Sequence, residues 1–194
     1  MKSFNIAAYI SGSGTNLRKI IDNSKKGIIR SKIRLVISDK QAEGLKYPDS
    51  LGIETAVISR NFLKRSEFLK KQTELLKKHS VDLIILAGYL KKIAPEIVNE
   101  FPGRILNIHP ALLPKFGGKG FHGINVHQAV LDADEEFSGP TVHFVDNKYD
   151  SGKILTQRKI RINSNETPET LQQKVLKEEH RILTEAIKIL ENRH

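Results

Sequence analysis

The sequence contains no cysteine and no tryptophan, and only 6% of its 194 residues are aromatic. The absence of cysteine excludes disulfide bonds, thiol catalysis and zinc sites with thiolate ligands. The low aromatic content disfavours a surface for single-stranded nucleic acid, which needs rings on which bases stack. No stretch approaches the roughly 18 apolar residues of a membrane-spanning helix, and the first apolar run is too short for a signal peptide. These absences predict a cytoplasmic protein that binds no membrane.

The remaining composition is that of a folded protein, with 39% hydrophobic and 28% charged residues, and its length suits one domain. Thirty-two Lys and Arg against 22 Asp and Glu give a formal net charge of +10. Such a charge suits a nucleic acid or an anionic small substrate equally. The lysines occur in scattered pairs, such as Lys70-Lys71 and Lys77-Lys78, which indicates solvated helix faces. We therefore expect no nucleic-acid partner, and a non-catalytic nucleic-acid-binding module stays as the alternative.

Strand-like and helix-like runs alternate through the first half of the chain. Strands are expected at 5–10, 33–38, 53–58, 83–87 and 104–108, and helices at 15–26, 66–79 and 95–100. Residues 42–51 are expected to form a poor helix, because Gly44 and Pro48 lie inside it. This alternation is typical of βαβ units. It predicts an α/β fold with a doubly wound, mostly parallel sheet.

The pattern changes after residue 110, where residues 110–123 carry two prolines and four glycines. A short helix is expected at 125–132, and the strand-like runs at 141–145 and 154–162 suggest an antiparallel pair. Thr167 and Pro168 then open a long final helix, with an N-cap residue followed by proline at the first helical position. No repeat or linker interrupts the chain, so one α/β domain is expected.

A glycine-rich turn, Ser-Gly-Ser-Gly-Thr-Asn-Leu at 11–17, connects the first strand to the first helix. Ligands of open α/β sheets bind at the carboxyl ends of strands, and exposed N–H groups at a helix start favour phosphate. The turn is not a P-loop, because the Gly-Lys-Ser/Thr ending is absent, and Leu17 replaces the third glycine of a dinucleotide site. An ordinary turn with Thr15 as the N-cap is the alternative.

A second candidate site follows the strand at 104–108. Strand alternation puts Asn107 and His109 on one face, and an amide donor beside an imidazole suits a developing oxyanion. A histidine bound to loop backbone is the alternative. Asp150, between the last two strands, is either a turn residue or, if its loop reaches His109, a carboxylate that raises the pKa of His109 above its usual ~6.5.

A metal site is not expected from this sequence. His122 and His127 are five positions apart, and no His-Glu-x-x-His motif occurs. Thiolate ligands are absent as well.

Several segments carry a resemblance to a known family. They are residues 11–17, Leu-Ala-Gly-Tyr-Leu-Lys-Lys-Ile at 86–93, Asn-Ile-His-Pro-Ala-Leu-Leu-Pro-Lys at 107–115, Pro-Thr-Val-His-Phe-Val at 140–145 and Tyr-Asp-Ser-Gly at 149–152. Together they resemble the folate-dependent formyltransferases that act on glycinamide ribonucleotide, in the right order over almost the whole chain. The resemblance implies a Rossmann-like formyltransferase fold over residues 1–194, with a ribonucleotide-phosphate half at 1–100 and a catalytic and folate half at 101–194.

The reaction implied by the resemblance is transfer of the formyl group of 10-formyltetrahydrofolate to the amine of glycinamide ribonucleotide, in de novo purine (IMP) biosynthesis. Asn107 and protonated His109 would hold the oxyanion, and Asp150 would keep His109 protonated. The protein would be a monomer or a homodimer without a metal. The residues implied to bind the ribonucleotide are Gly14, Thr15, Asn16 and Glu179. Those implied to bind the folate are Arg65, Leu90, Lys91, Lys92, Ile93, Asn107, Asp146, Asn147, Lys148, Tyr149 and Asp150.

Two other formyl-folate enzymes are the closest alternatives. A methionyl-tRNA formyltransferase, which the positive charge favours, would add a C-terminal RNA-binding domain. A formyltetrahydrofolate deformylase would carry a regulatory module before the first strand. We expect neither. The passage at 116–125 is longer and richer in glycine than in common family members, so the resemblance assigns no contact to it.

Overall fold

The computed structural model describes residues 3–193, and the chain forms two compact units. The first unit comprises the residues up to 106 and those from 187 onward, and the second comprises 107–186. A seven-stranded sheet has the order β3-β2-β1-β4-β5-β7-β8. Strand β5 (Ile105–His109) begins in the first unit and ends in the second. The predicted α/β class with a mostly parallel sheet is confirmed.

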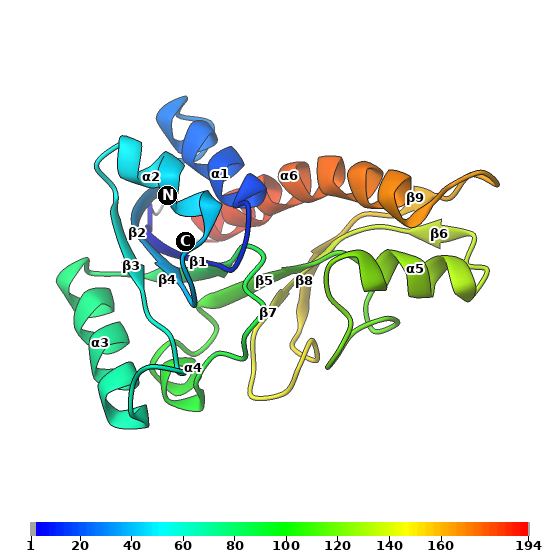
Figure 1. Cartoon of the computed structure of the whole chain (residues 1–194). Helices are drawn as coiled ribbons and strands as arrows, with labels where there is room; N and C mark the ends of the chain where they lie inside the picture. The colour runs from blue at the N-terminus through cyan, green and yellow to red at the C-terminus, as the bar shows by residue number, and fades with distance from the viewer. Residues whose placement is uncertain (1–2, 194) are drawn as a thin grey trace. The chain divides into compact units, whose positions relative to one another are not determined.

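The first unit is a series of βα units. Strand β1 pairs in parallel with β2 and with β4, and β2 pairs in parallel with β3. Helices α1 and α2 lie on one face of these strands, and α3 and α4 lie on the other (Figure 1). The elements are β1 (Asn5–Ile10), α1 (Thr15–Lys25), β2 (Lys32–Ser38), the 3-10 helix η1 (Glu43–Leu45), α2 (Lys46–Ser50), β3 (Glu54–Val57), α3 (Arg65–Lys78), β4 (Leu83–Leu86) and α4 (Pro95–Glu100).

The central strands of this unit are buried on both faces. Ile6, Ala8, Ile10, Ile84 and Ile85 are completely inaccessible to solvent, as expected for parallel strands covered by helices on both sides. The helix expected at 42–51 is instead divided into η1 and α2. Its sequence contains a glycine and a proline, which are the weakest helix formers. The turns that are candidate ligand sites follow the carboxyl ends of these buried strands.

The end of the chain is fixed within the first unit by a buried carboxylate. Glu191 is 2% exposed, and its Oε1 accepts hydrogen bonds of 2.7 Å from both the backbone N–H and the hydroxyl of Ser31. Replacing Glu191 with alanine leaves two buried donors unpaired, so we expect the free energy of unfolding to fall by about 2 kcal/mol. Chemical denaturation measures this loss. The exposed neighbour substitution Asn192→Ala should change stability by less than about 0.5 kcal/mol, and equal losses would contradict the role of Glu191.

The second unit contains the antiparallel part of the fold. Strand β7 (Thr141–Phe144) pairs with β8 (Ile154–Gln157), as predicted. The prediction of a single strand at 154–162 is wrong, because this segment forms two strands. The second, β9 (Ile160–Arg161), pairs with β6 (Phe137–Ser138) in a separate sheet. The break falls at Pro140: the Arg158 N–H donates to the Pro140 carbonyl, but proline has no N–H to donate in return, so the ladder is interrupted there.

Two helices complete the second unit: α5 (Ile124–Asp132) and α6 (Pro168–Asn192), whose last residues belong to the first unit. The hydroxyl of Thr167 accepts a hydrogen bond from the Thr170 N–H, which is the N-cap arrangement expected at this position. Val130 of α5 packs with Leu171 and Val175 of α6 in a small core. Within residues 3–193, no helix has the length and apolar character needed to cross a membrane.

Candidate active site

The structure brings Asn107, His109 and Asp150 together in the second unit. Asn107 and His109 project from β5, and Asp150 lies in the loop between β7 and β8. The Asn107 Nδ2 donates a 3.2 Å hydrogen bond to Asp150 Oδ1, and His109 Nδ1 lies 3.7 Å from Asp150 Oδ2. His109 is only 4% exposed. The loop therefore reaches the histidine, which is the condition that makes Asp150 more than a turn residue.

The hydrogen bonds of His109 determine which nitrogen faces the carboxylate. Its Nε2 donates to the carbonyl oxygen of Phe116 at 2.7 Å, since a carbonyl can only accept. Nδ1 consequently faces Asp150, and this arrangement is favourable when Nδ1 is also protonated. The site thus combines one imidazole, one carboxylate and one amide within contact distance.

The prediction that His109 has a raised pKa is wrong. Burial lowers the pKa of His109 below its ordinary value, and the opposing effects of Asp150 and of the Phe116 carbonyl are smaller. The physical reason is the cost of removing the imidazolium from water, which here exceeds its attraction to the carboxylate. Asp150 limits the decrease in pKa without reversing it.

The glycine-rich segment 116–123 contributes a backbone donor to Asp150. The Gly118 N–H donates a 2.8 Å hydrogen bond to Asp150 Oδ2, and Gly118 has a φ of +98°, which favours glycine. Burial, the largest single effect, acts to raise the pKa of Asp150. The contacts with His143, the Gly118 N–H and the charge of His109 nevertheless hold that pKa below its usual value. Asp150 is therefore an anion at neutral pH.

His143 is a site residue that the sequence analysis did not place in the catalytic set. It lies on β7, is 2% exposed, and its Nδ1 donates to the Phe144 carbonyl at 2.8 Å. Its Nε2 lies 3.1 Å from Asn107 Nδ2 and 3.5 Å from Asp150 Oδ1, within reach of both side chains. His143 thus orients the Asn107 amide. The sequence signal for His143 was its position two residues after Thr141, because this spacing places two polar side chains on the same face of one strand.

Thr141 holds the segment that follows His109. Its hydroxyl donates to the Ala111 carbonyl at 2.7 Å and accepts from the Leu113 N–H at 3.2 Å.

His127 of α5 is also buried beside the site, at 1% exposure. Burial and the charge of His109 lower the pKa of His127 to about 4. His127 is therefore neutral at physiological pH.

The glycine-rich turn between β1 and α1 belongs to the first unit. Gly14, and not Thr15, is the N-cap of α1, with a left-handed φ of +70°. A Cβ at Gly14 would lie 2.9 Å from the Cα of Gly44, so only glycine fits there. The first turn of α1 contains no acidic residue, which leaves the positive end of the helix dipole uncompensated. Backbone N–H groups at this turn suit an anion.

The other predicted binding residues are divided between the two units. Ile93 is buried, so its side chain does not line an open site, and the guanidinium of Arg65 pairs with Glu96 at 2.6 Å. Leu90, whose N–H donates to the Ser11 hydroxyl, is half exposed. In the first unit lie Gly14, Thr15, Asn16, Arg65, Leu90, Lys91, Lys92 and Ile93; in the second lie Asp146, Asn147, Lys148, Tyr149, Asp150 and Glu179. Their roles as substrate contacts remain predictions.

Among the residues that the structure describes, no group of three or more histidine, aspartate or glutamate side chains is arranged to hold a metal ion.

Comparisons with known proteins identify the family of this chain. Residues 4–187 match the formyl transferase family, and the chain therefore belongs to that family. Within it, the chain is 44% identical to the chloroplastic phosphoribosylglycinamide formyltransferase of Arabidopsis thaliana, over 94% of this chain and 63% of that protein. It is 40% identical to the phosphoribosylglycinamide formyltransferase of Haemophilus influenzae, over 94% of this chain and 85% of that protein.

Solved structures agree with these relatives. The glycinamide ribonucleotide transformylase 1 of Symbiobacterium toebii has a TM-score of 0.89 and 36% identity, and the match covers 97% of this chain and 88% of that one. A formyltetrahydrofolate deformylase of Pseudomonas syringae has a TM-score of 0.86 at only 19% identity, which shows the fold alone. The chain spans less than two thirds of the length of the plant relatives, 63% for A. thaliana and 60% for Vigna unguiculata.

Proposed function

We propose that this protein transfers the formyl group of 10-formyltetrahydrofolate to the amine of glycinamide ribonucleotide, in de novo purine biosynthesis. The observation that carries this proposal is the buried cluster of Asn107, His109 and Asp150. It occurs in a chain whose relatives are named phosphoribosylglycinamide formyltransferase. The net charge of +10 suits two anionic small substrates and requires no nucleic acid.

The catalytic cluster matches the charges that develop during this reaction. Attack of a neutral amine on the formyl carbonyl creates an oxyanion and an ammonium together. The Nε2–H of His109, now donated to Phe116, would be donated to the oxyanion, while Nδ1 stays toward Asp150. The Asn107 amide directs its hydrogens to His143 and Asp150, so the oxyanion would replace one of these acceptors. Such preorganised donors commonly supply the largest part of the rate.

Asp150 has two functions in this mechanism. Its negative charge favours the protonated form of His109, which burial alone would suppress. The negative charge of the oxyanion adds to this effect during the reaction. Asp150 would also move the proton from the ammonium toward the folate nitrogen, directly or through water.

The substrate contacts are proposed by residue. The N-terminus of α1, with Gly14, Thr15 and Asn16, would bind the ribonucleotide phosphate, and Glu179 would bind its sugar. The residues proposed to bind the folate are Arg65, Leu90, Lys91, Lys92, Ile93, Asn107, Asp146, Asn147, Lys148, Tyr149 and Asp150. Ile93 would contribute through its backbone. The protein would act in the cytoplasm as a monomer or a homodimer.

The function is tested by incubation with 10-formyltetrahydrofolate, with and without glycinamide ribonucleotide, while the absorbance of the folate product is followed. We expect product only when the ribonucleotide is present, with stoichiometric formylation of its amine. Equal rates without the ribonucleotide would identify a deformylase. Formylation of methionyl-tRNA alone would identify the other alternative.

The phosphate site can be tested without disturbing the fold by Thr15→Glu. A carboxylate in the first turn of a helix is favourable for the helix, so the melting temperature should not fall. Its charge would repel the phosphate, and we expect the KM for glycinamide ribonucleotide to rise about tenfold or more. The KM for the folate should stay constant, and the neutral variant Thr15→Gln is the control. An equal effect on both substrates would contradict a phosphate site here.

The backbone donor to Asp150 can be tested with Gly118→Ala. A side chain at a φ of +98° is strained by about 1–3 kcal/mol, which should displace the N–H from Asp150 and lower kcat about tenfold. Gly120→Ala is a matched control, because Gly120 has the same φ of +98° and the same open surroundings but makes no bond to Asp150. If both variants lose the same activity, the bond to Asp150 is not the cause.

A further inference from the structure

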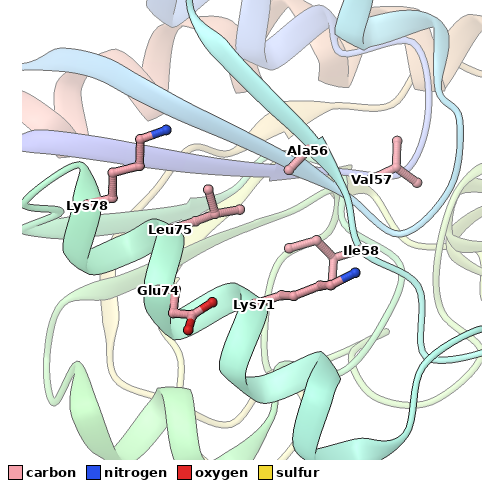
Figure 2. Close-up of a pocket in the computed structure, with 7 residues that line it drawn as sticks. All are labelled: Ala56, Val57, Ile58, Lys71, Glu74, Leu75 and Lys78. Carbon is pink, nitrogen blue, oxygen red and sulfur yellow. The ribbon is translucent and has the colours of Figure 1, made fainter.

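A groove in the first unit, between β3 and α3, is lined by residues that the proposed reaction does not use. Its volume is about 490 Å³ (Figure 2), within the range of small-molecule sites. Its floor is apolar and consists of Ala56 and Ile58 from the β3 region and Leu75 from α3. The side chain of Val57 points to the other side of the strand (Figure 2), as strand alternation requires. Ala56 and Leu75 are partly exposed. A concave apolar surface is thus open to solvent at the edge strand of the sheet.

The rim of the groove is charged and carries an excess of cations. Lys71, Glu74 and Lys78 lie on one face of α3. Lys78 pairs with Glu54 at 2.6 Å, and Glu74 lies 3.8 Å from Lys70. The side chain of Lys71 makes no ion pair or hydrogen bond with any of residues 3–193, and Figure 2 shows it extending toward Ile58. An ammonium without a partner therefore stands over the apolar floor.

The dimensions favour a small ligand over a protein partner. Strand β3 is only four residues long, which gives an added strand or a second copy little backbone to pair with. A stable protein interface buries about 800 Å² on each partner, far more than this short groove supplies. A ligand with one acidic group and an apolar body would match both the floor and the rim.

We propose that this groove binds a small amphipathic anion, with its apolar body on Ala56, Ile58 and Leu75 and its acid group at Lys71. The long stem of lysine packs on apolar surface while its ammonium stays in water, so Lys71 can contact both parts of the ligand. This binding is independent of the formyl transfer proposed above.

The probe is decanoate below its critical micelle concentration, titrated into the full-length ¹⁵N-labelled protein, with decanol as the uncharged analogue. We expect saturable amide shifts at residues 56–58 and 71–78 with decanoate, and weaker binding of decanol. Lys71→Gln should weaken decanoate binding about two- to fivefold, the range for a solvent-exposed ion pair. Lys19→Gln, at an exposed position of α1 outside the groove, should not.

A second variant, Ala56→Glu, tests the floor. The position is partly exposed on the edge strand, so the fold should persist, and the added charge should weaken decanoate binding at least about tenfold through repulsion and loss of apolar contact. Val57→Glu, whose side chain points to the other side of the strand, is the control and should have a much smaller effect. Absence of saturable shifts at these residues, equal affinity for decanol, or equal effects of Lys71→Gln and Lys19→Gln would each overturn the proposal.

Discussion

Replacing His109 with alanine is expected to leave a folded protein whose kcat for formyl transfer is lower by about 10²–10³, the usual cost of losing one oxyanion donor. The imidazole is 4% exposed and supplies the Nε2–H that would stabilise the oxyanion. Steady-state rates with both substrates saturating measure the effect. The KM for glycinamide ribonucleotide should change little, because the phosphate is proposed to bind at the α1 turn.

Three further variants make this result specific. Asn107→Ala should also lower kcat strongly, and the double variant should lose less than the product of the two single effects, since both side chains act on one intermediate. His79→Ala, at a half-buried histidine that pairs with Glu54, should keep normal turnover. Near-normal kcat in His109→Ala with an unchanged melting temperature would exclude the oxyanion role.

Replacing Asp150 with asparagine is expected to lower the pKa of His109 further and to reduce kcat about 10²-fold or more, the lower range for loss of a proton-transfer group. The carboxylate at 3.7 Å from His109 Nδ1 favours the imidazolium. Burial already lowers this pKa. When the carboxylate is removed, the largest effect that opposes burial is lost. Titration of His109 by NMR in both proteins measures the shift directly.

Asparagine is the appropriate substitution for geometric reasons. Asp150 has a φ of +49°, a left-handed conformation that asparagine adopts readily, and the new amide oxygen can still accept from the Gly118 N–H. The substitution therefore removes the charge and retains the shape, but its amide NH2 replaces the oxygen that accepts from Asn107 Nδ2, so the His109 titration is the readout that isolates the effect of the charge. The affinity for the ribonucleotide should be nearly unchanged. If the His109 titration is the same in both proteins, Asp150 is not coupled to the histidine.

The secondary structure of the first unit was largely predictable because its signals are local. The apolar runs of β1, β2 and β4 are bounded by turns, and helices on both sides of the sheet keep these runs uniformly apolar. The proline and glycine within 42–51 indicated a poor helix, and a 3-10 turn with a five-residue helix is found there. The pair β6 and β9 was not predicted, because two residues per strand are too few to show a period.

The candidate site also depends partly on local sequence signals and partly on contacts between distant parts of the chain. Sequence alone determined that Asn107 and His109 share a face, because a strand alternates its side chains with a period of two. Only the tertiary structure brought Asp150 to them, 43 positions along the chain from Asn107, since the pairing of β7 with β8 places their loop. Tertiary structure also determined the direction of the His109 pKa shift, because that shift depends on how much water the folded chain excludes from the imidazole.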